Sequence, residues 1–365
     1  MKYSLIIPVY NRPDEVGELL ASLETQTLKD FEVVVVEDGS TEPCLNVVNE
    51  HASRLALRYF GKQNSGPGQS RNYGAERSQG EYLIVLDSDC VLPPGYMQAV
   101  DDELRREPCD AFGGPDRAHR SFTPVQKAIN YSMTSFFTTG GIRGGKKKLD
   151  KFYPRSFNMG IRAGLYRRLG GFASMRFGED IDFSIRIFDS GASCRLFPEA
   201  WVWHKRRTDM KKFFKQVHNS GIARINLWKR HPGSLKPVHL LPAVFTVGVC
   251  FLAVLLLAGL SVVGYSLYGD IAASRLGDTG VVLSGWTIAG ILTSAVALLP
   301  VVLFSMLIFM DSLLRNRSLR VAWLSVWSSF IQLTGYGSGF LRAWWLRCVC
   351  SRNEELQAFR DNFYK

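Results

Sequence analysis

The chain has 365 residues, a formal net charge of +11 and 46% apolar residues. This length suits one large domain or two modest ones, and the apolar content would suit a globular protein if it were spread evenly. The apolar residues are instead concentrated after about residue 240, so the sequence indicates a soluble part followed by a membrane part.

The positive charge is concentrated just before the first long apolar run. Residues 205–236 contain ten Lys or Arg and one acidic residue, Asp209. Basic residues beside a membrane span favour the cytoplasmic side and attract anionic headgroups. Nucleic acid also selects basic surfaces, but no helix-turn-helix, zinc-finger or RNA-binding signature accompanies this charge, so we expect no nucleic acid partner.

Cysteine usage and the first residues indicate the compartment. The seven cysteines are odd in number and form no CxxC pair, which suits a reducing environment. The first apolar run is soon ended by Asn11 and Arg12 and is too short for a signal peptide. We therefore expect the N-terminal domain to lie in the cytosol.

Four short β-rich apolar segments recur near the start, at residues 3–9, 31–36, 55–60 and 82–86. Continuous apolar runs of this length are typical of strands buried on both faces of a parallel sheet. Residues 13–26 place their apolar side chains on one helical face, with Asn11 as the expected N-cap. Alternating strands and helices predict an α/β fold with a mostly parallel, doubly wound sheet.

Three apolar segments follow the soluble part. Residues 240–267 and 281–310 are each long enough to span about 30 Å of hydrocarbon. Three arginines follow the second segment, so both ends of this hairpin are expected in the cytosol. Residues 321–346 contain a GYGSG run and Arg342, and are predicted as a third span or as a re-entrant or interfacial helix.

Two acidic residues follow the fourth predicted strand, in the order Asp87-Ser88-Asp89. Ligands of such sheets bind beyond the carboxyl ends of the strands. Carboxylates two residues apart in an extended chain share a face, so both can approach one hard cation. Mg²⁺ or Mn²⁺ held there would neutralise the charge that builds on a nucleotide diphosphate as it leaves. An isolated acidic pair is a weak signal, because such pairs are common in turns.

Neighbouring motifs strengthen this interpretation. EDGS at residues 37–40 ends the second strand, NSGPGQSRN occupies residues 64–72, and GEY at residues 80–82 leads into the acidic pair. In this order, residues 4–231 resemble the family 2 glycosyltransferases, whose nucleotide-binding half has the GT-A fold.

The resemblance implies a donor site and a base preference. It places these residues around the donor nucleotide: Pro8, Tyr10, Asn11, Glu37, Asp38, Asn64, Arg71, Asp87 and Ser88. Tyr10 would stack in the base and ribose pocket, Asp38 would accept hydrogen bonds from the base, and Arg71 would lie against the base or phosphates. Family members often carry two aspartates where this chain has Glu37 and Asp38; a uridine donor is the usual case and guanosine stays open.

A second group of motifs looks like the acceptor half of the same family. SFNMG at residues 156–160 and GGF at residues 170–172 precede GEDID at residues 178–182. The resemblance implies that Asp180, beside Glu179, removes the acceptor proton during attack on the anomeric carbon, which inverts its configuration. Alternatively, these acids only complement the dipole of a helix that follows them.

The segment WVWHKRR at residues 201–207 adds further candidates. His204 is implied as a third metal ligand beside Asp89 and Asp87, although a lone histidine is often an ordinary surface residue. Arg206 and Arg207 could hold the diphosphate or the acceptor, or lie against the membrane surface.

Asn158, in the SFNMG motif, is a further candidate contact to the diphosphate or the acceptor. The Gln-x-x-Arg-Trp motif of processive members is absent, and the nearest match, at residues 216–220, lacks both Arg and Trp. We therefore expect single-sugar transfer. Residues 140–146 match the spacing of a phosphate-binding loop, but Lys147 stands where Ser or Thr is required.

The expected organisation is a cytosolic GT-A domain at residues 1–235, a membrane region at 236–346 and a basic tail at 347–365. Within the first domain, residues 1–110 form the nucleotide-binding half and residues 111–235 the acceptor half with the basic segment. The expected function is metal-dependent, inverting transfer of one sugar to a lipid-linked or glycolipid acceptor at the cell membrane. A polyprenyl-phosphate glycosyl synthase and a non-catalytic nucleotide-sugar-binding membrane protein are the alternatives, and the oligomeric state is left open.

Overall fold

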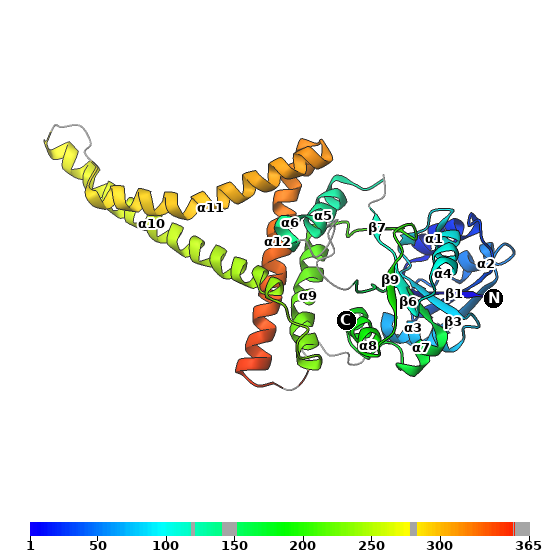
Figure 1. Cartoon of the computed structure of the whole chain (residues 1–365). Helices are drawn as coiled ribbons and strands as arrows, with labels where there is room; N and C mark the ends of the chain where they lie inside the picture. Colours follow the sequence, from blue (N-terminus) through cyan, green and yellow to red (C-terminus); the bar gives the residue numbers. More distant parts are fainter. Residues whose placement is uncertain (118–120, 141–151, 278–282, 353, 355–365) are drawn as a thin grey trace.

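A computed structural model describes residues 1–117, 121–140, 152–277, 283–352 and 354 (Figure 1). Most of residues 140–147, whose spacing resembles a phosphate-binding loop, lie outside the described residues, as do residues 278–282 between the two apolar helices and twelve of the nineteen residues of the basic tail. A sheet domain lies at one end of the molecule, and a long helical hairpin extends from the other (Figure 1).

The central sheet has seven strands in the order β3-β2-β1-β4-β8-β6-β9. They are β1 (Tyr3–Val9), β2 (Phe31–Asp38), β3 (Leu57–Lys62), β4 (Tyr82–Leu86), β6 (Ala111–Gly113), β8 (Asn158–Arg162) and β9 (Cys194–Leu196). The first four are parallel, whereas β8 runs antiparallel to both β4 and β6. The predicted mostly parallel α/β sheet is therefore confirmed.

The four predicted strands form because their apolar runs can be buried on both faces. Every residue of β1, β2 and β4 is buried. The third strand begins two residues later than predicted, at Leu57, and continues to Lys62, because its last residues pair with Glu37 and Asp38 of β2. This pairing brings the end of β3 to the same sheet edge as the acidic end of β2.

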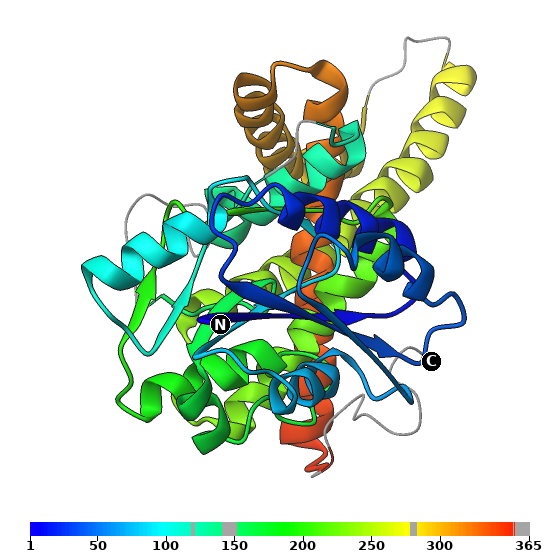
Figure 2. The same cartoon turned by 90° about the vertical axis from the view of Figure 1, so that its right-hand side faces the viewer.

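Helices cover both faces of this sheet (Figure 2). They are α1 (Pro13–Glu24), α2 (Leu45–His51), α3 (Pro67–Glu76), α4 (Tyr96–Arg106), α7 (Ala163–Arg168) and α8 (Glu179–Asp189). Helices α5 (Pro124–Thr134) and α6 (Phe136–Thr139) instead pack on the C-terminal helices (Figure 1). Helix α1 buries the predicted apolar face. The expected cap was wrong: Arg12 is the N-cap residue, and Asn11 adopts a left-handed φ of 51° and accepts hydrogen bonds from the amides of Thr41 and Glu42.

A small second sheet completes the domain. It consists of β5 (Cys90–Val91), β7 (Asp116–Arg117) and β10 (Val202–His204), with β10 in the centre. The antiparallel register pairs His204 with Cys90, directly after the acidic motif. A histidine more than 100 residues distant in sequence is thereby held beside Asp89.

Three long helices and one basic helix form the C-terminal part. They are α9 (Met210–Arg230), α10 (Leu241–Gly277), α11 (Gly285–Asn316) and α12 (Leu319–Trp344), with a 3₁₀ turn at Pro237–His239 and a final π turn at Trp345–Val349. Two stretches, Pro237–Ala272 and Gly285–Asn316, are long and apolar enough to cross a membrane. The third predicted segment is one continuous helix, α12, which stands beside α9 between the hairpin and the sheet domain (Figure 1).

Candidate active site

Strands β1, β2 and β4 deliver the predicted polar residues to one edge of the sheet. Beyond β4 the chain turns, with the amide of Cys90 donating to the carbonyl of Asp87 at 3.1 Å. Ser88 is buried inside this turn, while the Asp87 side chain is 29% exposed and that of Asp89 is 12% exposed. Both predicted carboxylates therefore lie at the border between the core and solvent, where a polar ligand can reach them.

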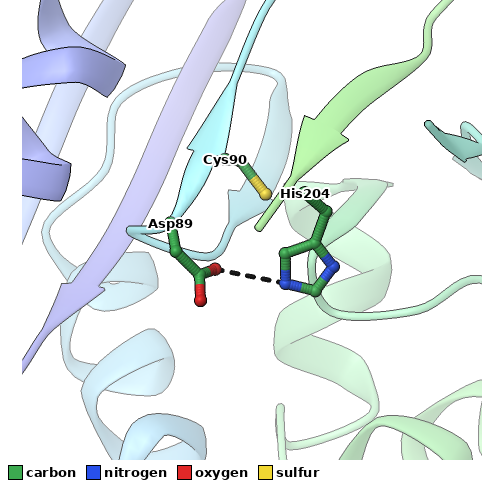
Figure 3. A group of neighbouring side chains, drawn as sticks. All are labelled: Asp89, Cys90 and His204. Atoms are coloured by element: carbon green, nitrogen blue, oxygen red, sulfur yellow. Dashed lines mark ion pairs between the residues drawn. The ribbon is translucent and has the colours of Figure 1, made fainter. Parts of the chain in front are cut away.

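His204 faces the carboxylate of Asp89 (Figure 3). Its Nε2 atom lies 3.1 Å from Asp89 Oδ1 and 3.9 Å from Asp87 Oδ2, and its ring stacks on Phe157 at 5.0 Å. The second oxygen of Asp89 pairs with Arg12. Burial opposes ionisation of Asp89, but His204 and Arg12 outweigh it and hold the pKa of this carboxyl well below its usual range. Burial also lowers the pKa of His204, and the Asp89 charge more than reverses that effect.

The donor set fits a divalent cation that prefers oxygen and imidazole ligands. The buried Asp89 Oδ1 atom faces His204 Nε2 at 3.1 Å without a hydrogen bond of good geometry, so a cation between the two groups could bind both. Two carboxylates and one imidazole suit Mg²⁺ or Mn²⁺. Cys90 points toward the same place, so its thiol is a further candidate ligand beside Asp89 and His204, although burial raises the pKa of this thiol.

Arg71 links the two predicted halves of the site. It projects from α3, is 3% exposed, and its two terminal nitrogens donate to Asp87 at 2.8 Å and to Glu179 at 2.9 Å. Its guanidinium also lies over the ring of Phe172, 5.2 Å from the centroid. A buried guanidinium bonded to two carboxylates sets the spacing between the metal-site acids and the acids of α8.

Glu179 and Asp180 lie in the first turn of α8, directly after Gly178, which has a left-handed φ of 86°. Arg155 donates from Nε to Asp180 at 2.6 Å. Burial opposes ionisation of Asp180, but Arg155 lowers the pKa of this carboxyl on balance. Burial and the neighbouring Asp180 charge raise the pKa of Glu179 despite its contact with Arg71. Asp180 is therefore the more readily ionised member of the pair.

Asp38 organises the loop between β3 and α3 from inside. It is buried and accepts hydrogen bonds from the amides of Ser65 at 2.9 Å and Gly66 at 2.8 Å, and from Lys62 Nζ at 2.6 Å. Asn64 donates to the Asp38 carbonyl at 2.8 Å. These bonds hold the NSGPGQSRN segment against the end of β2, so Asp38 shapes the predicted base pocket through the loop that it binds.

The other predicted donor residues lie at the same edge with varied surroundings. Glu37 is buried and accepts from Ser40 and from the amide of Cys44. Pro8 is buried within β1, whereas Tyr10 and Asn11, just beyond the strand, are half-buried. Glu37 thus supports the β2–α2 turn, and the residues after β1 border the site.

The remaining candidates of the acceptor half are separated by the fold. Asn158 is buried, accepts from Tyr96 Oη at 2.6 Å and donates to the Ala200 carbonyl at 2.8 Å, so its amide is engaged by the core. Arg206 pairs with Asp116 at 2.5 Å and donates to Asn130 at 3.1 Å. Arg207 is exposed. Arg207 is therefore freer than the other two to meet a ligand.

Sequence reasoning did not identify Arg12 and Arg155 as site residues. Arg12 directly follows the predicted pocket residues of β1, and a cation beside converging carboxylates is an expected counterion, so a charge argument could have found it. Arg155 lies 25 residues before its partner Asp180, and no local pattern joins the two.

Comparisons with known proteins identify a family for part of the chain. Residues 4–170 match the family described as Glycosyl transferase family 2. These residues belong to glycosyltransferase family 2. The family 2 domain has a GT-A fold. A similar fold is found in the mannosyltransferase PcManGT from Pyrobaculum calidifontis, solved with GDP-Man and Mn²⁺. That structure is 16% identical in sequence, the match covers 94% of this chain and 87% of the mannosyltransferase, and the TM-score is 0.53.

Two curated relatives share part of the family 2 domain. An uncharacterized glycosyltransferase of Rickettsia felis is 41% identical over 137 residues, which cover 38% of this chain and 22% of that protein. The poly(ribitol-phosphate) β-N-acetylglucosaminyltransferase TarS of Staphylococcus aureus is 39% identical over 93 residues, covering 24% of this chain and 16% of its own. The chain thus spans less than a quarter of the length of either relative.

Proposed function

We propose that the family 2 domain transfers one sugar, with inversion, from a uridine diphosphate sugar to an acceptor held at a membrane surface. One observation carries this proposal: Asp87, Asp89 and His204 converge at the sheet edge, and Arg71 ties them to the first turn of α8, where Asp180 stands. This arrangement supports a donor diphosphate and an acceptor base on adjacent sides of one site.

The chain's own residues would hold the donor. The loop bound by Asp38 would frame the base, and Tyr10 would stack at its border. Asp87, Asp89 and His204 would hold Mg²⁺ or Mn²⁺, which supplies compensation for the charge of the diphosphate. Arg12 and Arg71, each already beside one of these carboxylates, would hold the two acids in place.

Asp180 would accept the proton of an acceptor hydroxyl. Its lowered pKa keeps it ionised at neutral pH, and the contact with Arg155 fixes its orientation. Glu179, which Arg71 holds, would position the first turn of α8. Loss of the hydroxyl proton during attack from the face opposite the diphosphate gives inversion at the anomeric carbon.

The two long apolar helices support an acceptor at a membrane. Stretches Pro237–Ala272 and Gly285–Asn316 would cross the bilayer as a hairpin with both ends in the cytosol, beside the family 2 domain. This anchorage confines enzyme and acceptor to one surface and raises the effective concentration of a lipid-linked or glycolipid acceptor.

A donor screen tests this proposal. Purified full-length protein is incubated with nucleotide sugars, Mn²⁺ or Mg²⁺, and extracted membrane lipids, and the released nucleotide diphosphate is measured. We expect release with a uridine donor, and at least a 100-fold loss in Asp89→Asn, because removal of one metal-site charge weakens a transition-state interaction worth several kcal/mol. Asp102→Asn, an exposed acid on α4, is the matched control and should retain full activity. Undiminished turnover by Asp89→Asn would refute the proposal.

Asp180→Asn distinguishes two kinds of acceptor. A hydroxyl acceptor needs a base, so this variant should lose nearly all transfer while retaining donor binding. A phosphate acceptor is already ionised, so substantial remaining transfer would show that the acceptor is a polyprenyl phosphate. Nucleotide-sugar binding without turnover across a broad acceptor panel would favour a non-catalytic role.

A further inference from the structure

Helix α12 presents exposed tryptophans along one face. Trp323 is 62% exposed and Trp327 is 68% exposed, and Trp345 is exposed just after the helix ends. At about 100° per residue, positions 319, 323, 327, 330, 337, 341 and 345 fall within an arc of roughly 80°. Tryptophan is enriched where a side chain meets both the headgroups and the edge of the hydrocarbon.

This tryptophan face is turned toward the apolar hairpin. The Trp323 ring lies 5.0 Å from that of Phe309 on α11. Phe330, on the same arc, lies 5.7 Å from Phe245 of α10 and 5.5 Å from Phe304 of α11. Helix α12 therefore crosses the bases of α10 and α11 (Figure 1), and its exposed Trp323 lies against α11.

The opposite face of α12 is closed by α9. A Cβ atom on Gly339 would lie 2.0 Å from the carbonyl oxygen of His218, and one on Gly221 would lie 2.1 Å from that of Tyr336. These glycines allow the two helix backbones to touch. A helix so joined to the catalytic domain along its length stays on the side of the membrane where that domain lies.

Charge favours an anionic surface. Helices α9 and α12 contain no acidic residue between them. Arg320 and Arg342 stand near the two ends of α12, and exposed Lys211 and Lys212 begin α9. Basic side chains at this position attract the headgroups of anionic phospholipids.

We propose that α12 lies flat in the headgroup layer of an anionic bilayer, seated by its tryptophan face between the bases of α10 and α11. The placement of α12 does not depend on the proposed function. Only its consequence for the acceptor rests on that function. Helix α9 carries that consequence: its Leu227 and Ala223 pack against Gly178, and its cap residue His231 contacts Asp182 of α8 at 2.9 Å. The stack of α12, α9 and α8 holds Asp180 at a fixed height above the membrane, so the acceptor class is a lipid whose reacting group stands at headgroup level.

Fluorescence quenching by brominated phospholipids tests this placement without requiring turnover. The full-length protein is reconstituted in phosphatidylcholine vesicles with or without phosphatidylglycerol, with bromine placed near the carbonyl end or near the methyl end of the acyl chain. The double variant Trp323→Phe/Trp327→Phe lacks two of the eight tryptophans, so we expect it to lose about a quarter of the total emission. It should lose a larger share, more than a quarter, of the emission that the shallow bromine quenches. Phosphatidylglycerol should strengthen shallow quenching in the wild type.

The matched control removes Trp203 of β10 and Trp201, which directly precedes that strand. Trp201→Phe/Trp203→Phe should lose comparable total emission and leave the lipid-quenched emission unchanged. Preferential loss of deep quenching in Trp323→Phe/Trp327→Phe would overturn the proposal by placing α12 in the hydrocarbon. Equal lipid-quenched emission in this variant and the wild type would overturn it by showing that the face is covered, and a doubled particle mass in detergent would then identify a second copy as the cover.

Discussion

Substitution of Gly339 by alanine should separate the catalytic domain from its membrane helix. The added Cβ would lie 2.0 Å from the His218 carbonyl oxygen and 3.2 Å from the His218 Cα atom. Ordinary contacts of this kind need about 3.5 Å, so the backbones of α9 and α12 must move apart by roughly 1.5 Å. No rotamer change relieves the clash, because the opposing atoms belong to the backbone.

The expected cost follows from two opposing effects. Overpacking of a closely packed contact costs about 1–3 kcal/mol, and a backbone contact that cannot relax belongs at the upper end. Replacement of a helical glycine by alanine returns about 1 kcal/mol of helix propensity. We therefore expect Gly339→Ala to lower the free energy of unfolding by about 2 kcal/mol. It should also reduce kcat more than it changes the KM for donor, because α9 contacts α8 directly, whereas α8 reaches the acids after β4 only through Arg71.

Thermal unfolding of the purified protein in detergent micelles measures the effect. Gly248→Ala is the matched control, because it lies in α10 and an added Cβ there meets no atom within 4 Å. Its midpoint temperature should equal or exceed that of the wild type, since only the helix propensity changes. An unchanged midpoint and unchanged kcat in Gly339→Ala would refute the close contact of α9 and α12.

Three further predictions concern the candidate active site. Arg155→Gln should shift the acidic limb of kcat/KM to higher pH, because Arg155 lowers the pKa of Asp180 and the ionised form of Asp180 is the catalytic one. A pH profile of kcat/KM measures this shift, and an unshifted limb would contradict the role of Arg155. Asp38→Ala should raise the KM for donor at least 10-fold and cost about 1–3 kcal/mol of stability, since buried amides of the loop lose their acceptor; donor titration and thermal unfolding check both. Chelation of divalent cations should abolish diphosphate release, and turnover that resists the chelator would exclude the metal role. His204→Ala should raise the Mn²⁺ concentration needed for half-maximal activity by at least 10-fold.

Much of the fold could be predicted because its signals are local. Continuous apolar runs identified β1, β2 and β4, and helical periodicity identified α1. The expected cap of α1 was wrong because the side chain of Asn11 binds the turn after β2 instead. It accepts hydrogen bonds from the amides of Thr41 and Glu42, about 30 residues further along the chain. The GYGSG run of α12 similarly indicated an interruption, whereas its glycines permit close helix packing inside a continuous helix.

The candidate site shows the same difference between local signals and long-range contacts. The sequence by itself determined the acids after β4, the first turn of α8 and the segment leading to His204, because each follows a recognisable local motif. Only the tertiary structure decided that Arg71 joins Asp87 to Glu179 and that Arg155 holds Asp180. Such pairings depend on which loops meet at the sheet edge, and neither composition nor periodicity encodes a contact between side chains that many residues separate.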